Sequence, residues 1–196
     1  TREGGVMRLE YLLEEVYEEM LGKISENKEM SVEEAKKTAE IVALSAVKYG
    51  DLSNQASKDY IFDIQRFTSS EGNTGVYLLY TMVRIKSILN KYREQGGKTE
   101  KTQIAVTGNE SAKELMKAVA GFGAMIENAY LETAPHKVCA YMYDLANALN
   151  HFYHETKILT QENEAEKSAY IALLALTLRV MEECIGLLGF SAPERM

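Results

Sequence analysis

Two tyrosines and an arginine stand at helical spacing within one largely apolar stretch of this 196-residue chain. Tyr77, Tyr80 and Arg84 are three and four positions apart, which places them on one face of a helix. Aromatic rings beside a guanidinium group can stack an unpaired base and hold its phosphate. The alternative, which is common at this spacing, is that both rings pack in a core from which Arg84 extends to solvent.

Other residue patterns that could carry chemistry are weaker. His151 and His154 are three apart on a predicted helix, but no further ligand stands at a supporting spacing, so we predict no metal site. The glycines of Gly72–Gly75 could cradle a phosphate, but a loop that enters a helix explains them better, because glycine pairs are common in turns. The sequence contains no P-loop and no Ser/His/Asp order.

The charge of the chain is unevenly distributed. The formal net charge is −7, which argues against general nucleic-acid binding and against DNA as a partner. Residues 41–107 nevertheless carry nine basic and six acidic groups, a net of +3, whereas residues 1–40 and 108–196 each carry −5. Tyr77, Tyr80 and Arg84 lie in this basic section, which indicates a local RNA contact. The indication is weak, because a net charge of +3 over 67 residues is also compatible with statistical scatter.

The remaining composition indicates a globular protein. Cys139 and Cys184 lie in helical apolar patterns without CxxC spacing, which predicts reduced, buried thiols and a cytoplasmic location. No apolar run reaches the length of a membrane span and no signal peptide opens the chain, so no membrane partner is expected. Because the chain starts with Thr1, we expect a fragment or a processed product.

The apolar periodicity predicts an all-α fold. Helices are expected over residues 6–28, 32–49, 76–94, from Ser111 past Ile126, 135–154, and from Thr160 to Gly189. Ser31 and Glu34 form a capping box, as do Ser111 and Glu114, and Pro135 suits a first helical turn. Residues 60–64 read as a short irregular or β-like segment, and glycines suggest a domain boundary near residue 75. Residues 75–196 are therefore expected to form a bundle of about four helices.

Three segments resemble arginyl-tRNA synthetases, which are class I enzymes. Residues 46–89 resemble the region that leads into the helical anticodon-binding domain of that family. Residues 193–196, Pro-Glu-Arg-Met, match the way its chains end, and residues 1–4 resemble half of its signature loop. The resemblance implies the C-terminal part of such an enzyme. Residues 1–74 would be the end of the catalytic domain, a mostly helical region that contacts the tRNA stem, and residues 75–196 a DALR-type anticodon-binding domain.

The resemblance also implies roles for individual residues. The tRNA anticodon would be contacted by Tyr77, Tyr80, Arg84, Tyr153 and Met196, and the tRNA stem by Lys48, Lys58 and Arg66. Arg2 would be the remnant of the signature loop that places positive charge on the ATP phosphates. The chain departs from the family pattern at Gln65, Val76 and Leu149–Asn150.

The implied parent enzyme attaches arginine to its tRNA with ATP and Mg²⁺. The nucleotide-binding core is absent from the resemblance, so this chain alone is expected to hold no cofactor, to be inactive, and to be a monomer. Two alternatives stay open. One is an acidic helical module that docks partner proteins without an RNA role, and the other is the related domain of cysteinyl-tRNA synthetases.

Overall fold

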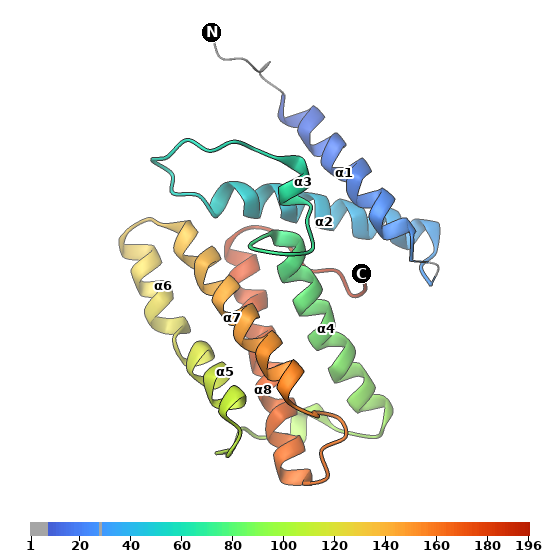
Figure 1. Ribbon diagram of the computed structural model, residues 1–196, viewed down its shortest axis with the longest axis vertical. Helices are drawn as coiled ribbons and strands as arrows, with labels where there is room; N and C mark the ends of the chain where they lie inside the picture. Colours follow the sequence, from blue (N-terminus) through green and yellow to red (C-terminus); the bar gives the residue numbers. More distant parts are fainter. Residues whose placement is uncertain (1–7, 28) are drawn as a thin grey trace.

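The computed structural model describes residues 8–27 and 29–196, and all regular structure within them is helical. Figure 1 shows two layers, with α1 and α2 lying across one end of a bundle of longer helices. The helices are α1 (Leu9–Ser25), α2 (Val32–Leu52), α3 (Ile64–Phe67), α4 (Gly75–Glu94), the 3₁₀ turn η1 (Thr99–Lys101), α5 (Glu110–Ala120), α6 (Phe122–Leu131), α7 (Pro135–Glu155) and α8 (Glu164–Leu187). The predicted all-α class is confirmed.

The first layer is a helical hairpin. α1 buries Val16, Met20 and Ile24, which recur at the expected spacing of four, against the alanine-rich face of α2. The predicted capping box is confirmed, because Glu34 N–H donates to Ser31 Oγ at 3.2 Å and Ser31 N–H donates to Glu34 Oε2 at 2.9 Å. These hydrogen bonds hold the pKa of the Glu34 carboxyl below its ordinary value.

The second layer is the helical bundle. α4, α7 and α8 pack on one another, and α5 and α6 follow each other along the outer side of α7. Pro135 occupies the first turn of α7, and Gly189 ends α8 with a φ of 78°, both as predicted. The largest fully buried side chains of the bundle are Leu78, Leu79, Met82, Ile85, Leu115, Met142, Leu145, Leu149, Phe152 and Ile171.

Two predicted helix starts are wrong because asparagines cap the helices instead. α5 starts at Glu110, where Asn109 Oδ1 accepts from Ala112 N–H at 3.0 Å, so Ser111 lies inside the helix. α8 starts at Glu164 and not near Thr160, because Asn163 Oδ1 accepts from two N–H groups of the first turn. Side-chain oxygens at the N-cap satisfy N–H groups that the helix leaves unpaired.

The long helix expected after Ser111 is divided, and the short segment at residues 60–64 is not a strand. The helix breaks at Gly121, and the hydroxyl of Tyr141 in α7 donates to the Ala118 carbonyl at 3.0 Å near the end of α5. A helix can end where an outside donor satisfies such a carbonyl. Residues 60–63 are irregular, and Ile64 opens the one-turn helix α3, which Asp63 caps.

The two layers meet most closely where α2 passes the start of α4. A Cβ atom on Gly75 would lie 2.7 Å from the Ser45 carbonyl oxygen and 3.0 Å from Tyr49 Cβ, so only glycine fits this position. The buried hydroxyl of Tyr49 lies 2.6 Å from Asn73 Oδ1 and 2.9 Å from the Cys139 carbonyl of α7. Tyr49 thereby joins α2, the turn before α4, and α7. The predicted domain boundary at Gly75 falls at this contact and stays a prediction.

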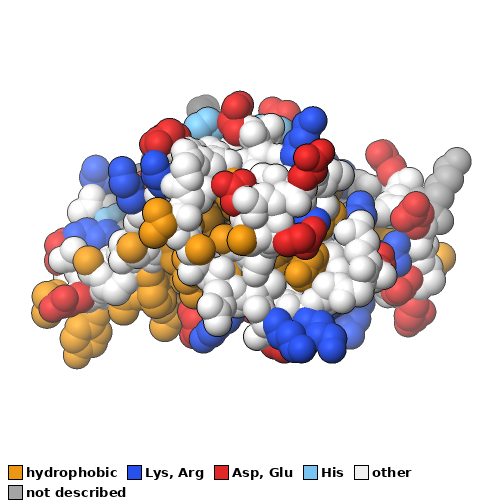
Figure 2. Space-filling model, turned by 90° about the horizontal axis from the view of Figure 1, so that it is seen from below, with side chains coloured by type: hydrophobic (Ala, Val, Ile, Leu, Met, Phe, Trp, Pro, Cys, Tyr) orange, Lys and Arg blue, Asp and Glu red, His pale blue; other side chains and the backbone are white. Residues whose placement is uncertain are grey.

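The surface of the described residues carries charges of both signs. Figure 2 shows hydrophobic side chains gathered at the left edge, the side on which α6 lies in Figure 1. Tyr130 and Leu131 of α6 are 82% and 70% exposed. Within residues 8–27 and 29–196, no helix combines the length and the apolar character that crossing a membrane requires.

We expect Gly75→Ala to lower the free energy of unfolding by about 1–3 kcal/mol, because the added methyl group overpacks the contact between α2 and α4. The control is Gly22→Ala in α1, where an added Cβ meets nothing within 4 Å. That change should raise the free energy of unfolding by about 0.5–1 kcal/mol through helix propensity. Urea denaturation measures both, and equal effects of the two changes would contradict the close contact.

The two cysteines should be chemically inert in the folded chain. Both thiols are free and buried, as predicted, and burial raises the pKa of each to about 12. Because the thiolate is the reactive form, neither should react with a thiol reagent at pH 8 until the chain unfolds. The folded state keeps the thiol protons above pH ~8.5, where the unfolded chain releases them, so stability should fall as pH rises from there toward 12. Fast labelling without denaturant would contradict this expectation.

Candidate nucleic-acid interface

The helix α4 presents different faces to four neighbours. Its first turn is capped by Thr74, whose Oγ1 accepts from Tyr77 N–H at 3.1 Å. Its apolar residues face α2 and α8, and Tyr77 and Arg84 face α7. Apart from Arg93 and Glu94 in the last turn, what remains exposed is a strip along the helix, consisting of Tyr80, Ser87, Asn90 and Lys91. This strip and its borders form the candidate interface.

A chain of hydrogen bonds joins α4 to α7 beside the strip. The Arg84 guanidinium donates to Asn150 Oδ1, and Asn150 Nδ2 donates to the Tyr77 hydroxyl at 2.7 Å. The Tyr77 hydroxyl in turn donates to Asn147 Oδ1 at 2.8 Å, and its ring packs 5.8 Å from that of Tyr143. Each group in the chain donates once in the same direction, so the bonds polarise one another. Tyr77 is half-buried, which agrees more with the packing alternative than with a free stacking surface.

The aromatic rings that remain available are those of Tyr80 and Tyr153. Tyr153 is 39% exposed and its ring centroid lies 5.1 Å from the Arg84 guanidinium carbon, a cation–π contact between α7 and α4. Tyr80, four residues before Arg84, is 37% exposed. The contacts between described residues use one of the five N–H donors of Arg84, so other donors are left for a ligand. An orientated guanidinium that contacts one exposed ring and lies about one helical turn from another can bind a base edge or a phosphate.

Met196 borders the same strip from the other side. Its side chain is half-buried against the apolar core. It lines a surface pocket of about 330 Å³ whose wall on α4 is made of Val83, Ser87, Asn90, Lys91 and Glu94. The structure therefore brings Arg84 into contact with Tyr153 and joins Tyr77 to Arg84 through Asn150. It places Tyr80 and Met196 along the exposed surface of the same helix.

Asn147 was not predicted as a member of this site, and Asn150 was named only as part of a departure from the family pattern. Tyr143, Asn147 and Asn150 recur at spacings of four and three along α7, the spacing of one helix face. This polar stripe, on a helix whose buried face is otherwise apolar, was the sequence feature that could have indicated the site. The partner of the stripe was not visible, because Tyr77 lies 73 positions before Asn150.

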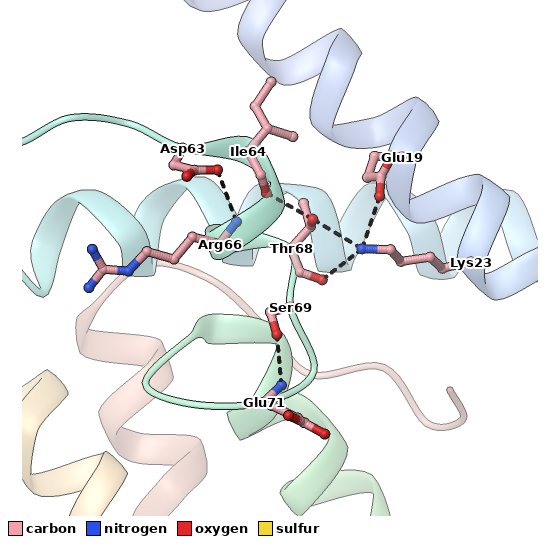
Figure 3. A network of polar contacts seen from close by, with 8 residues as sticks. All are labelled: Glu19, Lys23, Asp63, Ile64, Arg66, Thr68, Ser69 and Glu71. Carbon is pink, nitrogen blue, oxygen red and sulfur yellow. Dashed lines mark hydrogen bonds and ion pairs between the residues drawn. The ribbon is translucent and has the colours of Figure 1, made fainter.

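No direct contact joins the three basic residues that were predicted to contact the tRNA stem. Lys48 of α2 is half-buried and donates to the Gly189 carbonyl after α8. Lys58 is exposed in the irregular segment. Arg66 is exposed in α3, and Figure 3 shows its side chain directed away from the nearby polar cluster. Lys48 is thus occupied inside the protein, whereas the other two remain accessible.

The polar cluster of Figure 3 explains how α3 is held. Lys23 of α1 donates to the Thr68 carbonyl at 3.2 Å and lies 3.1 Å from Thr68 Oγ1, and it pairs with Glu19 at 3.0 Å. Asp63 Oδ1 accepts from Arg66 N–H at 3.1 Å and caps the turn. These contacts fix the backbone of α3 and leave the guanidinium of Arg66 in solvent.

Two other residues that the sequence singles out are Arg2 and His151. Arg2, with the segment that resembles the signature loop, lies outside the described residues. His151 Nδ1 lies 3.0 Å from Glu114 Oε2 on α5, a surface contact. Within residues 8–27 and 29–196, His, Cys, Asp and Glu side chains form no group of three that could hold a metal ion.

Comparisons with known proteins bear on the whole chain. The family described as the DALR anticodon binding domain matches residues 78–196, and the catalytic domain of class I (R) tRNA synthetases matches residues 1–64. The arginine–tRNA ligase of Agathobacter rectalis is 61% identical over 204 aligned residues that cover 100% of this chain. The chain belongs to the arginyl-tRNA synthetase family. The cysteinyl alternative is thereby set aside.

Solved structures of arginyl-tRNA synthetases share the fold. The enzyme from Thermus thermophilus superimposes with a TM-score of 0.88 at 25% identity over 100% of the chain. The enzyme from Plasmodium falciparum gives a TM-score of 0.85 at 26% identity over 97% of the chain. This arginyl-tRNA synthetase chain spans about a third of the length of its relatives, 34% of the Agathobacter ligase and 33% of the Thermus enzyme. It corresponds to the end of the catalytic domain and the DALR domain.

We expect Asn150→Ala to lower the free energy of unfolding of this synthetase chain by about 1–3 kcal/mol, because it leaves Tyr77 and Arg84 without their shared partner. Tyr77→Phe should cost about 1 kcal/mol, and the double variant should cost less than the sum of the two. Urea denaturation of the four chains measures the coupling.

The control is Asn90→Ala, which removes an exposed hydrogen bond with Arg93 on α4. Its effect should stay within about 0.5 kcal/mol. Strict additivity of the Asn150 and Tyr77 variants would show that the two side chains do not act as one network.

Proposed function

We propose that this chain recognises the anticodon of an arginine tRNA, as part of an enzyme that attaches arginine to that tRNA. The observation that carries the proposal is the cluster of Tyr80, Arg84 and Tyr153, in which two partly exposed rings accompany an orientated guanidinium. The family of the chain supports it, since its residues 78–196 match an anticodon-binding domain.

The geometry suggests a division of labour among the predicted residues. Tyr80 and Tyr153 would stack bases that leave the anticodon loop, each stack contributing about 1–3 kcal/mol. Arg84 would hold a base edge or a phosphate through its remaining donors. Tyr77 would mainly support the position of Arg84 and not contact RNA itself, because its hydroxyl is already bound to Asn147 and Asn150. Met196 would close the other side of the strip.

The proposed partner is tRNA specifically, and not nucleic acids in general. The net charge of −7 disfavours general attraction to phosphates, so recognition must rest on a local site. The exposed Lys58 and Arg66, on the layer that precedes the bundle, would meet the backbone of the tRNA stem. All arginine anticodons share a cytosine in the middle position, which makes that base the natural object of discrimination.

The activity of the parent enzyme is part of the proposal. It would join arginine to the tRNA with ATP and Mg²⁺. The reaction would take place in the cytoplasm, where translation uses aminoacyl-tRNA. We assign no ATP or Mg²⁺ ligand among the described residues, and Arg2 is the one residue of this chain proposed to lie near the ATP phosphates. Aminoacylation by this chain alone is therefore not expected.

One feature favours the alternative of a protein-docking module. Tyr130 and Leu131 of α6, with Leu187 of α8, expose apolar surface beside a pocket of about 400 Å³. These residues lie on α6 and α8 and not on the exposed strip of α4. They do not compete with the proposed RNA contacts, and they provide a matched control for them.

We expect the 196-residue chain to bind an arginine tRNA transcript more tightly than a transcript with guanine in the middle anticodon position. Tyr80→Ala and Tyr153→Ala should each weaken the first interaction by about 5- to 150-fold, because each removes one base stack. Fluorescence anisotropy at low salt measures the dissociation constants.

The control is Tyr130→Ala, which removes an exposed tyrosine of the same size on α6 and should leave the affinity unchanged. Equal, salt-dependent binding of both transcripts would reduce the interaction to backbone contacts and overturn the anticodon proposal. Absence of binding to both at low salt would overturn it for this chain as well.

A further inference from the structure

The last eight residues of the chain form a tail that crosses from one layer to the other. It leaves α8 at Gly189 and runs along α2 and α4, and Figure 1 places its end beside α4. Phe190 and Pro193 are buried, whereas Ser191, Glu194 and Arg195 are exposed, so one side of the tail packs against the protein. A terminal segment that is not tied down is ordinarily disordered.

Contacts from α2, α4 and the turn between α1 and α2 hold the tail. Lys48 of α2 donates to the Gly189 carbonyl, and Ser45 Oγ lies 3.5 Å from the Ser191 carbonyl. Near the end of the tail, Arg195 lies 3.5 Å from Glu29, in the turn between α1 and α2. These contacts are mostly single hydrogen bonds or an exposed ion pair, which stabilise only weakly.

The contact made by Lys86 of α4 differs from the others. Its Nζ donates to the Pro193 carbonyl at 3.2 Å and to Glu194 Oε1 at 2.6 Å, so it grips the backbone and a side chain of the tail together. The Lys86 side chain is only 12% exposed, so its charge is largely withdrawn from water and depends on these two acceptors. It is therefore not available to a phosphate.

The position of Lys86 links its hydrogen bonds with the tail to the location of Met196. It lies on α4 two residues after Arg84, and it holds the tail two and three residues before Met196. Met196 borders the pocket above Val83, Ser87 and Asn90 of the same helix. A residue three positions from a fixed carbonyl can move at most about 10 Å from it, so the contact limits how far Met196 can leave that pocket.

We infer that Lys86 is a positioning residue for RNA recognition, which fixes the C-terminal tail so that Met196 stays against the exposed strip of α4. The inference rests on the proposed function of that strip. Basic residues of this chain thus serve the RNA site in two ways: Arg84 by direct contact, and Lys86 through the tail. Lys86→Met removes the charge and keeps most of the apolar stem, whereas Lys86→Arg keeps a donor able to reach both acceptors.

Two measurements test the inference on the 196-residue chain. In hydrogen exchange, Lys86→Met should increase the rates of the hydrogen-bonded tail amides of Gly189 and Phe190 by about tenfold, while the amides in the centre of α8 keep theirs. In binding to the arginine tRNA transcript, Lys86→Met and Met196→Ala should each lose about tenfold in affinity. The double variant should lose no more than either, because both changes remove the same contact. Lys86→Arg should restore both readouts.

A matched control is Lys113→Met on α5, which removes an ion pair with Glu110 at 2.7 Å and does not involve the tail. It should change neither readout. The inference is overturned if Lys86→Met leaves tail exchange unaltered, or if the losses in affinity multiply in the double variant. If Met196→Ala binds normally while Tyr80→Ala is weakened, this inference fails and the proposed function stands. If Tyr80→Ala and Tyr153→Ala also bind like the parent chain, both fail.

Discussion

The close passage of α2 over the start of α4 is the constraint on which the other contacts depend. Gly75 permits the backbone of α4 to approach the Ser45 carbonyl, and the buried Tyr49 hydroxyl ties the preceding turn to α7. The contact at Gly75 fixes where α4 begins, and burial of Leu78, Met82 and Ile85 fixes its rotation about its axis. That rotation turns Tyr77 and Arg84 toward α7, leaves Tyr80 in solvent, and directs Lys86 toward the tail. Displacement of α4 at Gly75 would therefore disturb all of these contacts together.

Most of α4 is used for packing, and this explains why the exposed strip is narrow. The helix contacts α2, α7, α8 and η1. Only the strip that begins at Tyr80 remains for a ligand, and its two borders come from distant parts of the chain, Tyr153 of α7 and Met196 of the tail. A recognition surface assembled from three segments is rigid only if each segment is held. The hydrogen-bonded chain through Asn150 holds one border, and Lys86 holds the other.

Positive charge in this chain serves structure as well as recognition. Of the basic residues in the section with net charge +3, Lys48 and Lys86 donate to tail carbonyls, whereas Lys58 and Arg66 are exposed. A lysine that satisfies a carbonyl under partial burial cannot release it for a phosphate without leaving the carbonyl unpaired. A local excess of lysine in a sequence is for this reason an unreliable measure of phosphate binding.

The sequence by itself determined the all-helical class, the capping box at Ser31, the start of α7 at Pro135, the glycine that ends α8, and a family resemblance that the comparisons bear out. These features depend on spacings of a few residues, which a sequence displays directly. Only the tertiary structure decided which distant side chains meet. Tyr141 donates to the Ala118 carbonyl where α5 ends, and Asn150 joins Tyr77 to Arg84. Lys48 donates to the Gly189 carbonyl of the tail. Those contacts join residues from 23 to 141 positions apart, and helical periodicity carries no information on which distant side chain supplies the partner.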